Sequence, residues 1–359
     1  MASRGGEDAA IADIAADDKP VAPTLYQAYS SNLRKAVDAV FADGRNAGTA
    51  DRLRANVSRF AAYKAWHATA QVREALDENG GDMEAARRTL RRFNRWQAAE
   101  YNTAVARSRT AKQWQQWNDG GDNSRVFPNI VWLPSMSTTP REEHRAFWNR
   151  VWPKDDPFWD TNQPGNLWNC KCDWEQTDEP ATNGNPTAAI RHNGLEGNPG
   201  KTGEVFTDEC SYIKKVNAGM PTEIIRAVRD INRSLYADTD LHFSTSIGRV
   251  WVDNISIIEV TKGAKTDESY FLKQEIARHF DLYASQLQPL PDEAIDLSHN
   301  NPDSDFYKRK EQFEKMKVFR LKIIGQDYKG NRKTFDYQVK LGKYKNSEKL
   351  NLYSITEPW

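Results

Sequence analysis

The chain has 359 residues, enough for two or three domains, and its 50 Lys and Arg residues balance its 50 Asp and Glu residues, so total charge excludes no class of partner. No apolar run approaches the roughly 20 residues of a membrane span and the N-terminus lacks an apolar leader, so we expect a soluble protein made in a cytoplasm, without a membrane partner. Three cysteines, two of them spaced Cys-x-Cys, argue against a disulfide framework and suit a reducing compartment.

The first part of the chain predicts a helical bundle. Residues 1–22 are acidic and poor in large apolar side chains, which is typical of a disordered tail. Three amphipathic helices are expected at 24–42, 51–79 and 82–117, because apolar residues recur there every three or four positions between Gly-containing turns. Asp82 is the expected N-cap of the third helix.

A basic stripe runs along that third helix beside Trp96. It consists of Arg87, Arg88, Arg91, Arg92 and Arg95. Such a stripe either meets packaged DNA or an acidic partner, or is simply a solvated helix face, and charge runs are more often the second.

The central segment, residues 141–174, holds five of the twelve tryptophans and follows an expected strand at 126–133. Prolines at 153, 157 and 164 interrupt any helical or strand period, because each fixes φ and removes an N–H donor. Linkers lack Trp and Phe, so this is not a linker. The sequence predicts a compact irregular segment held together by aromatic side chains.

The same segment resembles the signature of the phage Mu F-like minor head proteins. The matching residues are Arg141, His144, Asp155-Asp156-Pro157-Phe158-Trp159, Pro164-Gly165 and Asn169-Cys170-Lys171-Cys172. Two departures are Lys171, where Arg is usual, and Asn149-Arg150, where many members have a Gly turn. The resemblance spans roughly residues 26–179. It implies a small α+β module over the helices, a head-morphogenesis role with portal and capsid proteins and packaged DNA or RNA as partners, and a location in the virion after assembly in the host cytoplasm.

His144, Cys170 and Cys172 form one candidate metal set. Zinc accepts thiolate and imidazole and normally takes four ligands, so Asp156 or Asp173 would be the fourth. Two cysteines one residue apart chelate only from a turn, because on a strand they face opposite sides. The alternative is that the three side chains are buried structural residues packed among the tryptophans.

Residues 181–203 are rich in Pro, Gly and Asn and predict a linker between a domain at 23–180 and a second domain at 204–359. The Gly-Lys-Thr at 200–202 misses the spacing of a phosphate loop. The second domain predicts helices at 221–235, 267–287 and 305–317, and strands at 318–325, 333–341 and 350–356 with two more within 241–260. The expected fold class of the whole chain is α+β.

Helices followed by a basic antiparallel sheet resemble, in outline, the barnase/EndoU/RelE-like ribonuclease toxins. Residues 308–349 carry 14 Lys and Arg against 5 Asp and Glu. RNA cleavage needs a general base, a general acid and a cation for the phosphate. The candidate catalytic residues are His299, His279, Arg320, Lys340, Tyr353 and Thr356. The resemblance implies a metal-independent endoribonuclease with an immunity protein as partner. The alternatives are a nucleic-acid-binding domain without catalysis and a purely structural virion protein.

Overall fold

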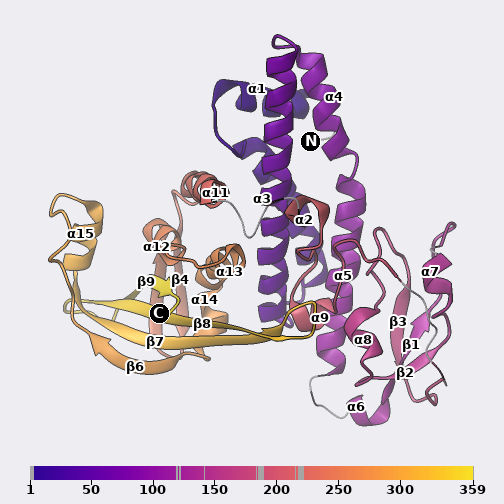
Figure 1. The fold of residues 1–359 in the computed structure, drawn as a ribbon. Coiled ribbons are helices and arrows are strands. Elements are labelled where there is room, and N and C mark those ends of the chain that lie inside the picture. Colours follow the sequence, from indigo (N-terminus) through magenta and orange to yellow (C-terminus); the bar gives the residue numbers. More distant parts are fainter. Residues whose placement is uncertain are drawn as a thin grey trace. The chain divides into compact units, whose positions relative to one another are not determined.

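The computed structural model describes residues 4–118, 120, 123–140, 142–182, 184, 190–214, 216 and 222–358. The chain divides into two compact units (Figure 1). Unit 1 comprises Met1–Ile224 and Gly325–Arg332, and unit 2 comprises Ile225–Ile324 and Lys333–Trp359. Helices dominate the start of the chain and a largely antiparallel sheet dominates its end, which confirms the α+β class. Within the described ranges, none of the helices combines the length and apolar character that crossing a bilayer demands.

Long helices build most of unit 1. They are α1 (Arg4–Ala16), α2 (Pro23–Val40), α3 (Ala47–Glu78), α4 (Met83–Asn94) and α5 (Gln97–Trp117). Helix α2 packs against α3 and α5, and α1 packs against α2, α3 and α4 (Figure 1). The apolar stripes of α2 and α3 that the sequence predicts are the buried faces, with Leu25, Leu33 and Leu53 fully enclosed. Burial of these stripes is what holds the bundle together.

Helix α1 corrects the expectation of a disordered tail. Ile11 and Ile14 are buried against the bundle, and the carboxylates of Glu7 and Asp8 pair with arginines of α4. A segment with few large apolar residues is ordered here because α4 offers it both an apolar surface and positive charge.

The expected third helix is two helices. Asp82 caps α4 as predicted, since its Oδ1 accepts a hydrogen bond from the Glu84 amide at 2.8 Å. Helix α4 then ends at Asn94, and α5 begins at Gln97. Half of the Trp96 side chain is exposed at this break.

Short elements follow α5 in unit 1. They are α6 (Asn123–Val126), β1 (Asn129–Leu133), α7 (Glu142–Arg145), β2 (Val151–Pro153), α8 (Phe158–Thr161), β3 (Asp173–Thr177), α9 (Pro199–Thr202) and α10 (Ser211–Lys214). The three strands form one sheet of order β2-β1-β3, antiparallel throughout. Of the strand expected at 126–133, only residues 129–133 form a strand, which is β1.

The segment expected to be a linker is folded where the structure describes it. Leu195, Asn198 and Thr202 are buried, and α9 packs against α5. Gly200 leaves no room for a side chain, because a Cβ there would lie 2.6 Å from Trp114 Cβ. The Gly-Lys-Thr at 200–202 is thus a packing feature, and Lys201 pairs with Asp160.

Unit 2 combines helices with a six-stranded sheet of order β4-β5-β9-β8-β7-β6. Its helices are α11 (Thr222–Leu235), α12 (Asn254–Val260), α13 (Asp267–Arg278), α14 (Phe280–Ala284) and α15 (Asp305–Glu311). Its strands are β4 (Asp240–Thr245), β5 (Gly248–Asp253), β6 (Gln288–Glu293), β7 (Phe313–Gln326), β8 (Arg332–Tyr344) and β9 (Leu350–Thr356). Strands β5 and β9 pair in parallel, whereas β9 pairs with β8 and β6 pairs with β7 antiparallel.

Two segments of unit 2 differ from the prediction. Residues 255–260, expected as a strand, lie in α12, because the Asp253 carboxylate accepts hydrogen bonds from the Ser256 amide and hydroxyl and starts a helix there. Residues 288–293 carry two prolines and follow the helix predicted at 267–287, and no strand is predicted there. They form the edge strand β6, where a missing N–H donor is tolerated.

Candidate metal centre in a tryptophan-rich module

The middle of the chain forms an aromatic core around the three-stranded sheet. Its buried members are Trp114, Ile130, Trp132, Phe147, Trp152, Phe158, Trp159 and Trp174. Trp152 stacks on Phe158 with ring centroids 3.9 Å apart, and Trp132 and Trp159 lie parallel at 6.4 Å. The expectation of a compact segment pinned by aromatic side chains is confirmed. Large aromatic residues suit this role because each buries much apolar area without regular backbone structure.

Helix α5 holds the turn that precedes the cysteines. The Thr110 hydroxyl donates to the Pro164 carbonyl at 2.8 Å, and the Asn169 amide donates to Thr103 Oγ1 at 2.9 Å. Gly165 has φ +91° and passes so close to α5 that a Cβ would meet Ala106 Cβ at 3.3 Å. Asn169 also has a positive φ, 58°, so the chain turns immediately before Cys170. A turn is what the Cys-x-Cys spacing requires for both thiols to face the same way.

His144 comes from α7 and is fully buried. Its Nε2 lies 3.0 Å from the Asn166 side-chain oxygen, and the Asn166 amide nitrogen donates to the Thr161 carbonyl at 2.9 Å. The second contact fixes the amide so that its oxygen faces the ring. Nε2 therefore carries the proton, and Nδ1 presents a lone pair.

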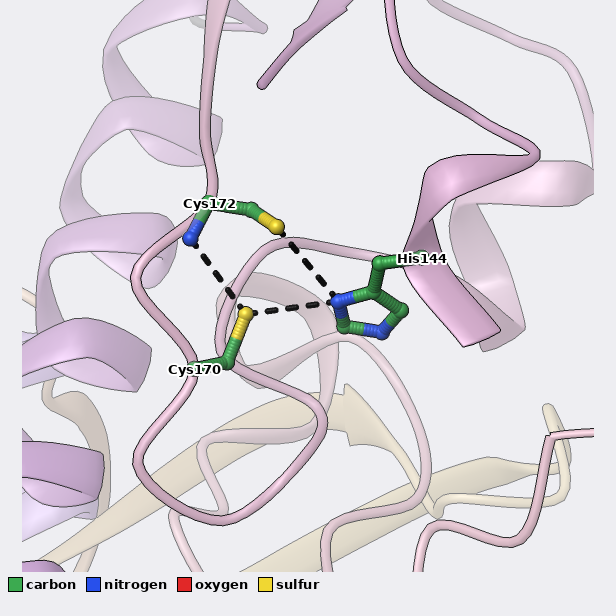
Figure 2. Close-up of side chains that lie close together, drawn as sticks. All are labelled: His144, Cys170 and Cys172. Carbon is green, nitrogen blue, oxygen red and sulfur yellow. Dashed lines mark hydrogen bonds between the residues drawn. The ribbon is translucent and has the colours of Figure 1, made fainter. Parts of the chain in front are cut away.

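Both thiols converge on that nitrogen (Figure 2). His144 Nδ1 lies 3.3 Å from Cys170 Sγ and 3.6 Å from Cys172 Sγ. The Cys172 amide also donates to Cys170 Sγ at 3.4 Å. A hydrogen bond from the Cys170 thiol, together with His144, lowers the pKa of Cys172 to about 4, whereas the same pairing and burial raise the pKa of Cys170.

The predicted metal set is thus brought together, with all its donor atoms within 4.8 Å of one another. The predicted fourth ligands are not in this group as the structure describes it. Asp156 Oδ1 instead accepts from the Phe158 amide, and Asp173 Oδ1 accepts from the Trp174 amide. Arg141 of the signature lies outside the described residues.

Comparison with known proteins places this module in a family. Residues 49–175 match the model of the Phage Mu protein F like protein family. This segment is a Mu F-like domain. Capsid assembly protein F of Escherichia phage Mu is 32% identical over 75 residues, which is 21% of this chain and 16% of that protein. No solved structure matches the chain.

The Mu F-like domain covers α3 to β3 and includes the candidate metal set, so the family that the sequence resembled is confirmed. The chain covers only a small part of the phage Mu protein's length. The fold of unit 1 extends beyond the match on both sides, through α1 and α2 before it and through residues 190–214 after it.

Arg107 ties the segment after the match to the Mu F-like domain, and sequence reasoning missed it. It is fully buried on α5, and its guanidinium donates to the carbonyls of Leu195, Glu196, Gly197 and Glu204 at 2.8–3.1 Å. Burial lowers the pKa of Arg107 to about 10. Asn56 acts in the same way, since its side chain accepts from the Val205 and Phe206 amides. The only sign of these contacts in the sequence is that polar residues occupy helix positions that the apolar periodicity predicts to be buried.

The basic stripe of α4 is partly neutralised. Arg87 Nε lies 2.7 Å from Asp8 Oδ1, and Arg91 Nε lies 3.1 Å from Glu7 Oε2. Arg88 remains mostly exposed. The stripe therefore serves in part to bind α1, a role that neither sequence interpretation included.

The six candidate catalytic residues of unit 2 occur in separate local settings. His279 caps the C-terminus of α13 with Nδ1 3.9 Å from Glu275 Oε2, and His299 lies in an exposed turn near Asp296. Arg320 forms an ion pair with Asp336, and Lys340 forms one with Glu293. Two further candidates lie on β9, where Tyr353 packs against Phe306 and Thr356 pairs with Gln338.

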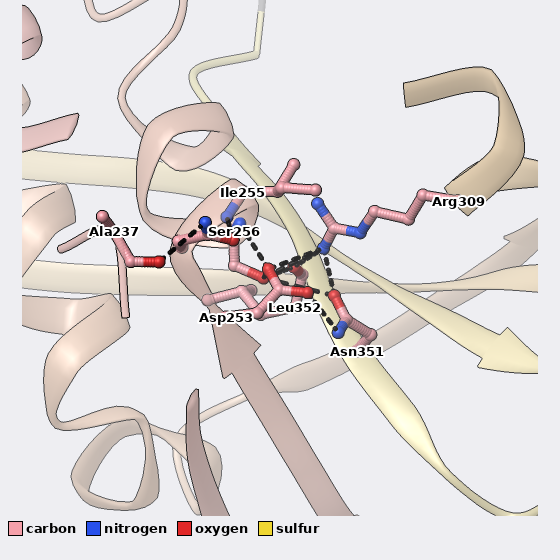
Figure 3. A network of polar contacts seen from close by, with 8 residues as sticks. Ala237, Asp253, Ile255, Ser256, Arg309, Asn351 and Leu352 are labelled. Carbon is pink, nitrogen blue, oxygen red and sulfur yellow. Dashed lines mark hydrogen bonds and ion pairs between the residues drawn. The ribbon is translucent and has the colours of Figure 1, made fainter. Parts of the chain in front are cut away.

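A different polar cluster organises unit 2 (Figure 3). Arg309, from α15, is buried and donates to Ser256 Oγ, to the Leu352 carbonyl at 2.9 Å and to the Asn351 side chain. Asp253 Oδ1 lies 3.6 Å from the same guanidinium nitrogen. The cluster joins α12, α15 and β9. The hydrogen-bond acceptors around Arg309 compensate for the burial of its charge, so the cluster has a structural role.

Proposed function

We propose that this protein acts in phage head morphogenesis and that its Mu F-like domain docks onto the portal or the capsid during assembly. The observation that carries the proposal is the family match at residues 49–175, because it covers the aromatic core and the His–Cys–Cys group together. A rigid module suits docking, since little ordering entropy is lost on binding. Its partners would be portal and capsid proteins, and it would travel in the virion after assembly in the host cytoplasm.

The test is co-expression of the full chain with the capsid and portal proteins of its phage, followed by sedimentation of the particles. We expect the chain in the particle fraction. Trp159→Ala removes a fully buried ring from the aromatic core and should abolish incorporation, whereas Trp251→Ala, a half-buried tryptophan of unit 2, should leave it intact. Absence of the wild-type chain from particles, or equal incorporation of both variants, would overturn the proposal.

As a second candidate we propose that unit 2 is an effector domain that acts on RNA. The support is that β7, β8 and β9 follow the helices of the unit in a largely antiparallel sheet, together with the basic segment at 308–349. Unit 2 as a whole has 20 Lys and Arg against 19 Asp and Glu, because acidic residues elsewhere in the unit offset that segment. Arg320 and Lys340 would have to leave their carboxylates to hold a phosphate. An immunity protein would be the natural partner of such an activity.

Expression of the full chain in bacteria, with RNA integrity as the readout, tests this second role. RNA decay that His299→Ala abolishes would support catalysis through that residue. RNA binding that weakens steeply with salt, without decay, would indicate a nucleic-acid-binding domain instead. Intact RNA and no binding would leave unit 2 as a structural part of the virion protein and would refute the effector proposal.

A further inference from the structure

The distances from the His144 nitrogen to the two thiol sulfurs in the Mu F-like domain match those of a tetrahedral metal site. Zinc binds imidazole nitrogen at about 2.05 Å and thiolate sulfur at about 2.3 Å, so a tetrahedral angle separates the two atoms by roughly 3.5 Å. The observed separations from His144 Nδ1 are 3.3 Å to Cys170 Sγ and 3.6 Å to Cys172 Sγ. Small shifts of the side chains would bring all three atoms to bonding distance from a common centre.

Hydrogen bonding alone does not account for this arrangement. Because the Asn166 oxygen accepts a hydrogen bond from Nε2–H, Nδ1 has a single lone pair, and one lone pair accepts one well-aligned hydrogen bond. Two sulfurs nevertheless point at it from two sides (Figure 2). A cation between the three atoms would satisfy all of them at once.

The surroundings of His144 are those of a metal ligand. A ligating imidazole donates its other ring N–H to a carbonyl or carboxylate oxygen, which fixes the ring and its tautomer. Asn166 supplies that oxygen, and the Thr161 carbonyl holds Asn166 in place. The Cys172 amide donates to Cys170 Sγ, which stabilises a sulfur that carries negative charge.

We propose that His144 Nδ1, Cys170 Sγ and Cys172 Sγ bind one Zn²⁺, with water in the fourth position. The ligand set of two sulfurs and one nitrogen favours zinc over magnesium or calcium, which prefer oxygen. Binding displaces the protons of the thiols, because thiolate is the ligand form. Cys172 is the donor that is partly exposed, so the ion enters from its side and the water faces that opening.

The ion would join α7 to the turn that precedes β3. The His and Cys-x-Cys residues of the signature would then stabilise the irregular segment of the domain by binding one ion. The inference concerns unit 1 alone and does not depend on the docking role proposed above.

The test uses the full chain purified under reducing conditions, with zinc content measured by inductively coupled plasma mass spectrometry. We expect about one zinc per chain. Replacement of zinc by Co²⁺ should produce a sulfur-to-cobalt charge-transfer band. Cys172→Ser should lose at least tenfold in metal affinity, whereas Cys210→Ser, which alters a buried cysteine outside the group, should bind like the wild type.

A second measurement keeps the proposal testable if Cys172→Ser fails to fold. Alkylation of the wild-type chain, mapped by peptide mass, should label Cys170 and Cys172 only after zinc is removed, with labelling of Cys210 unchanged by the metal. A folded wild-type chain that takes up no Co²⁺, or whose Cys172 reacts equally with and without zinc, would overturn the inference and indicate an imidazole–thiol cluster without metal.

Discussion

Replacing Arg107 by methionine should destabilise unit 1 strongly. Methionine keeps much of the side-chain length but removes every donor, so the carbonyls of Leu195, Glu196, Gly197 and Glu204 lose their buried partner. A hydrogen bond that involves a charged group contributes about 1.5–3 kcal/mol. The four contacts share two nitrogens and do not add independently, and each buried carbonyl left without a donor costs about 1–3 kcal/mol, so the total should be about 3–5 kcal/mol. We expect the free energy of unfolding of unit 1 to fall by that amount.

The assay is urea unfolding followed by tryptophan fluorescence. Ten of the twelve tryptophans lie within residues 1–224, so the signal reports mainly on unit 1. With a slope of about 3 kcal/mol per molar urea, the midpoint should move down by roughly 1 to 1.7 M. Arg109→Met is the matched control, because Arg109 is exposed on the same helix and its loss should change stability by less than about 0.5 kcal/mol. Equal midpoints for the two variants would refute the role assigned to Arg107.

Three further sets of substitutions test local contacts in both units. Glu100→Gln should cost about 3–5 kcal/mol, because it leaves the buried Lys64 ammonium without its carboxylate 2.5 Å away, and Lys64→Met in addition should restore most of the loss in a thermal melt. Burial lowers the pKa of Lys64 below its ordinary value of 10.5, and loss of the Glu100 carboxylate should lower that pKa further. Between the folded pKa and 10.5 the unfolded chain holds more protons than the folded chain. The stability of Glu100→Gln should therefore rise with pH over that range. Asp82→Ala should cost about 1 kcal/mol and Asp82→Asn nearly nothing, as measured by urea midpoint. Gly342→Ala should destabilise unit 2, monitored by amide hydrogen exchange of β8, because the new Cβ would lie 2.5 Å from the Phe313 ring.

If Glu100→Gln and its double variant with Lys64→Met are equally stable, the pair is not coupled. If Asp82→Asn costs as much as Asp82→Ala, the cap does not act through a side-chain acceptor. Unchanged exchange of β8 amides in Gly342→Ala would show that Phe313 moves aside freely.

Local periodicity made much of the fold predictable. Helices α2 and α3 agree with the predicted spans to within a few residues, because their apolar stripes are continuous and Gly-containing turns separate them. Strand β9 also occurs as predicted, and a turn at Asp327–Asn331 with Gly330 at φ +84° joins β7 to β8 between the strands predicted at 318–325 and 333–341. The candidate metal residues could be named from spacing and residue type alone.

Contacts distant in sequence were not predictable. Nothing local to Arg107 indicates that its partners lie at 195–204, and nothing local to Glu7 indicates an arginine on α4. At 255–260 a single capping carboxylate, Asp253, outweighs a β-prone apolar run. The ion pairs of the nuclease candidates were equally unpredictable. Residue type and strand position do not reveal that Arg320 pairs with Asp336 or that Lys340 pairs with Glu293.

The route of the chain limits how the protein can be divided. Residues 325–332, the tip of the hairpin between β7 and β8, belong to unit 1, where the Tyr328 hydroxyl donates to Glu209 at 3.2 Å and its backbone packs beside Gly197. No single cleavage of the polypeptide therefore releases both units whole. A fragment that ends at Ile224 lacks residues 325–332 of unit 1. A fragment that begins after Ile224 carries those residues without the rest of unit 1. Any exchange of the C-terminal half between related phages would have to preserve or replace that small returning segment together with the surface it covers.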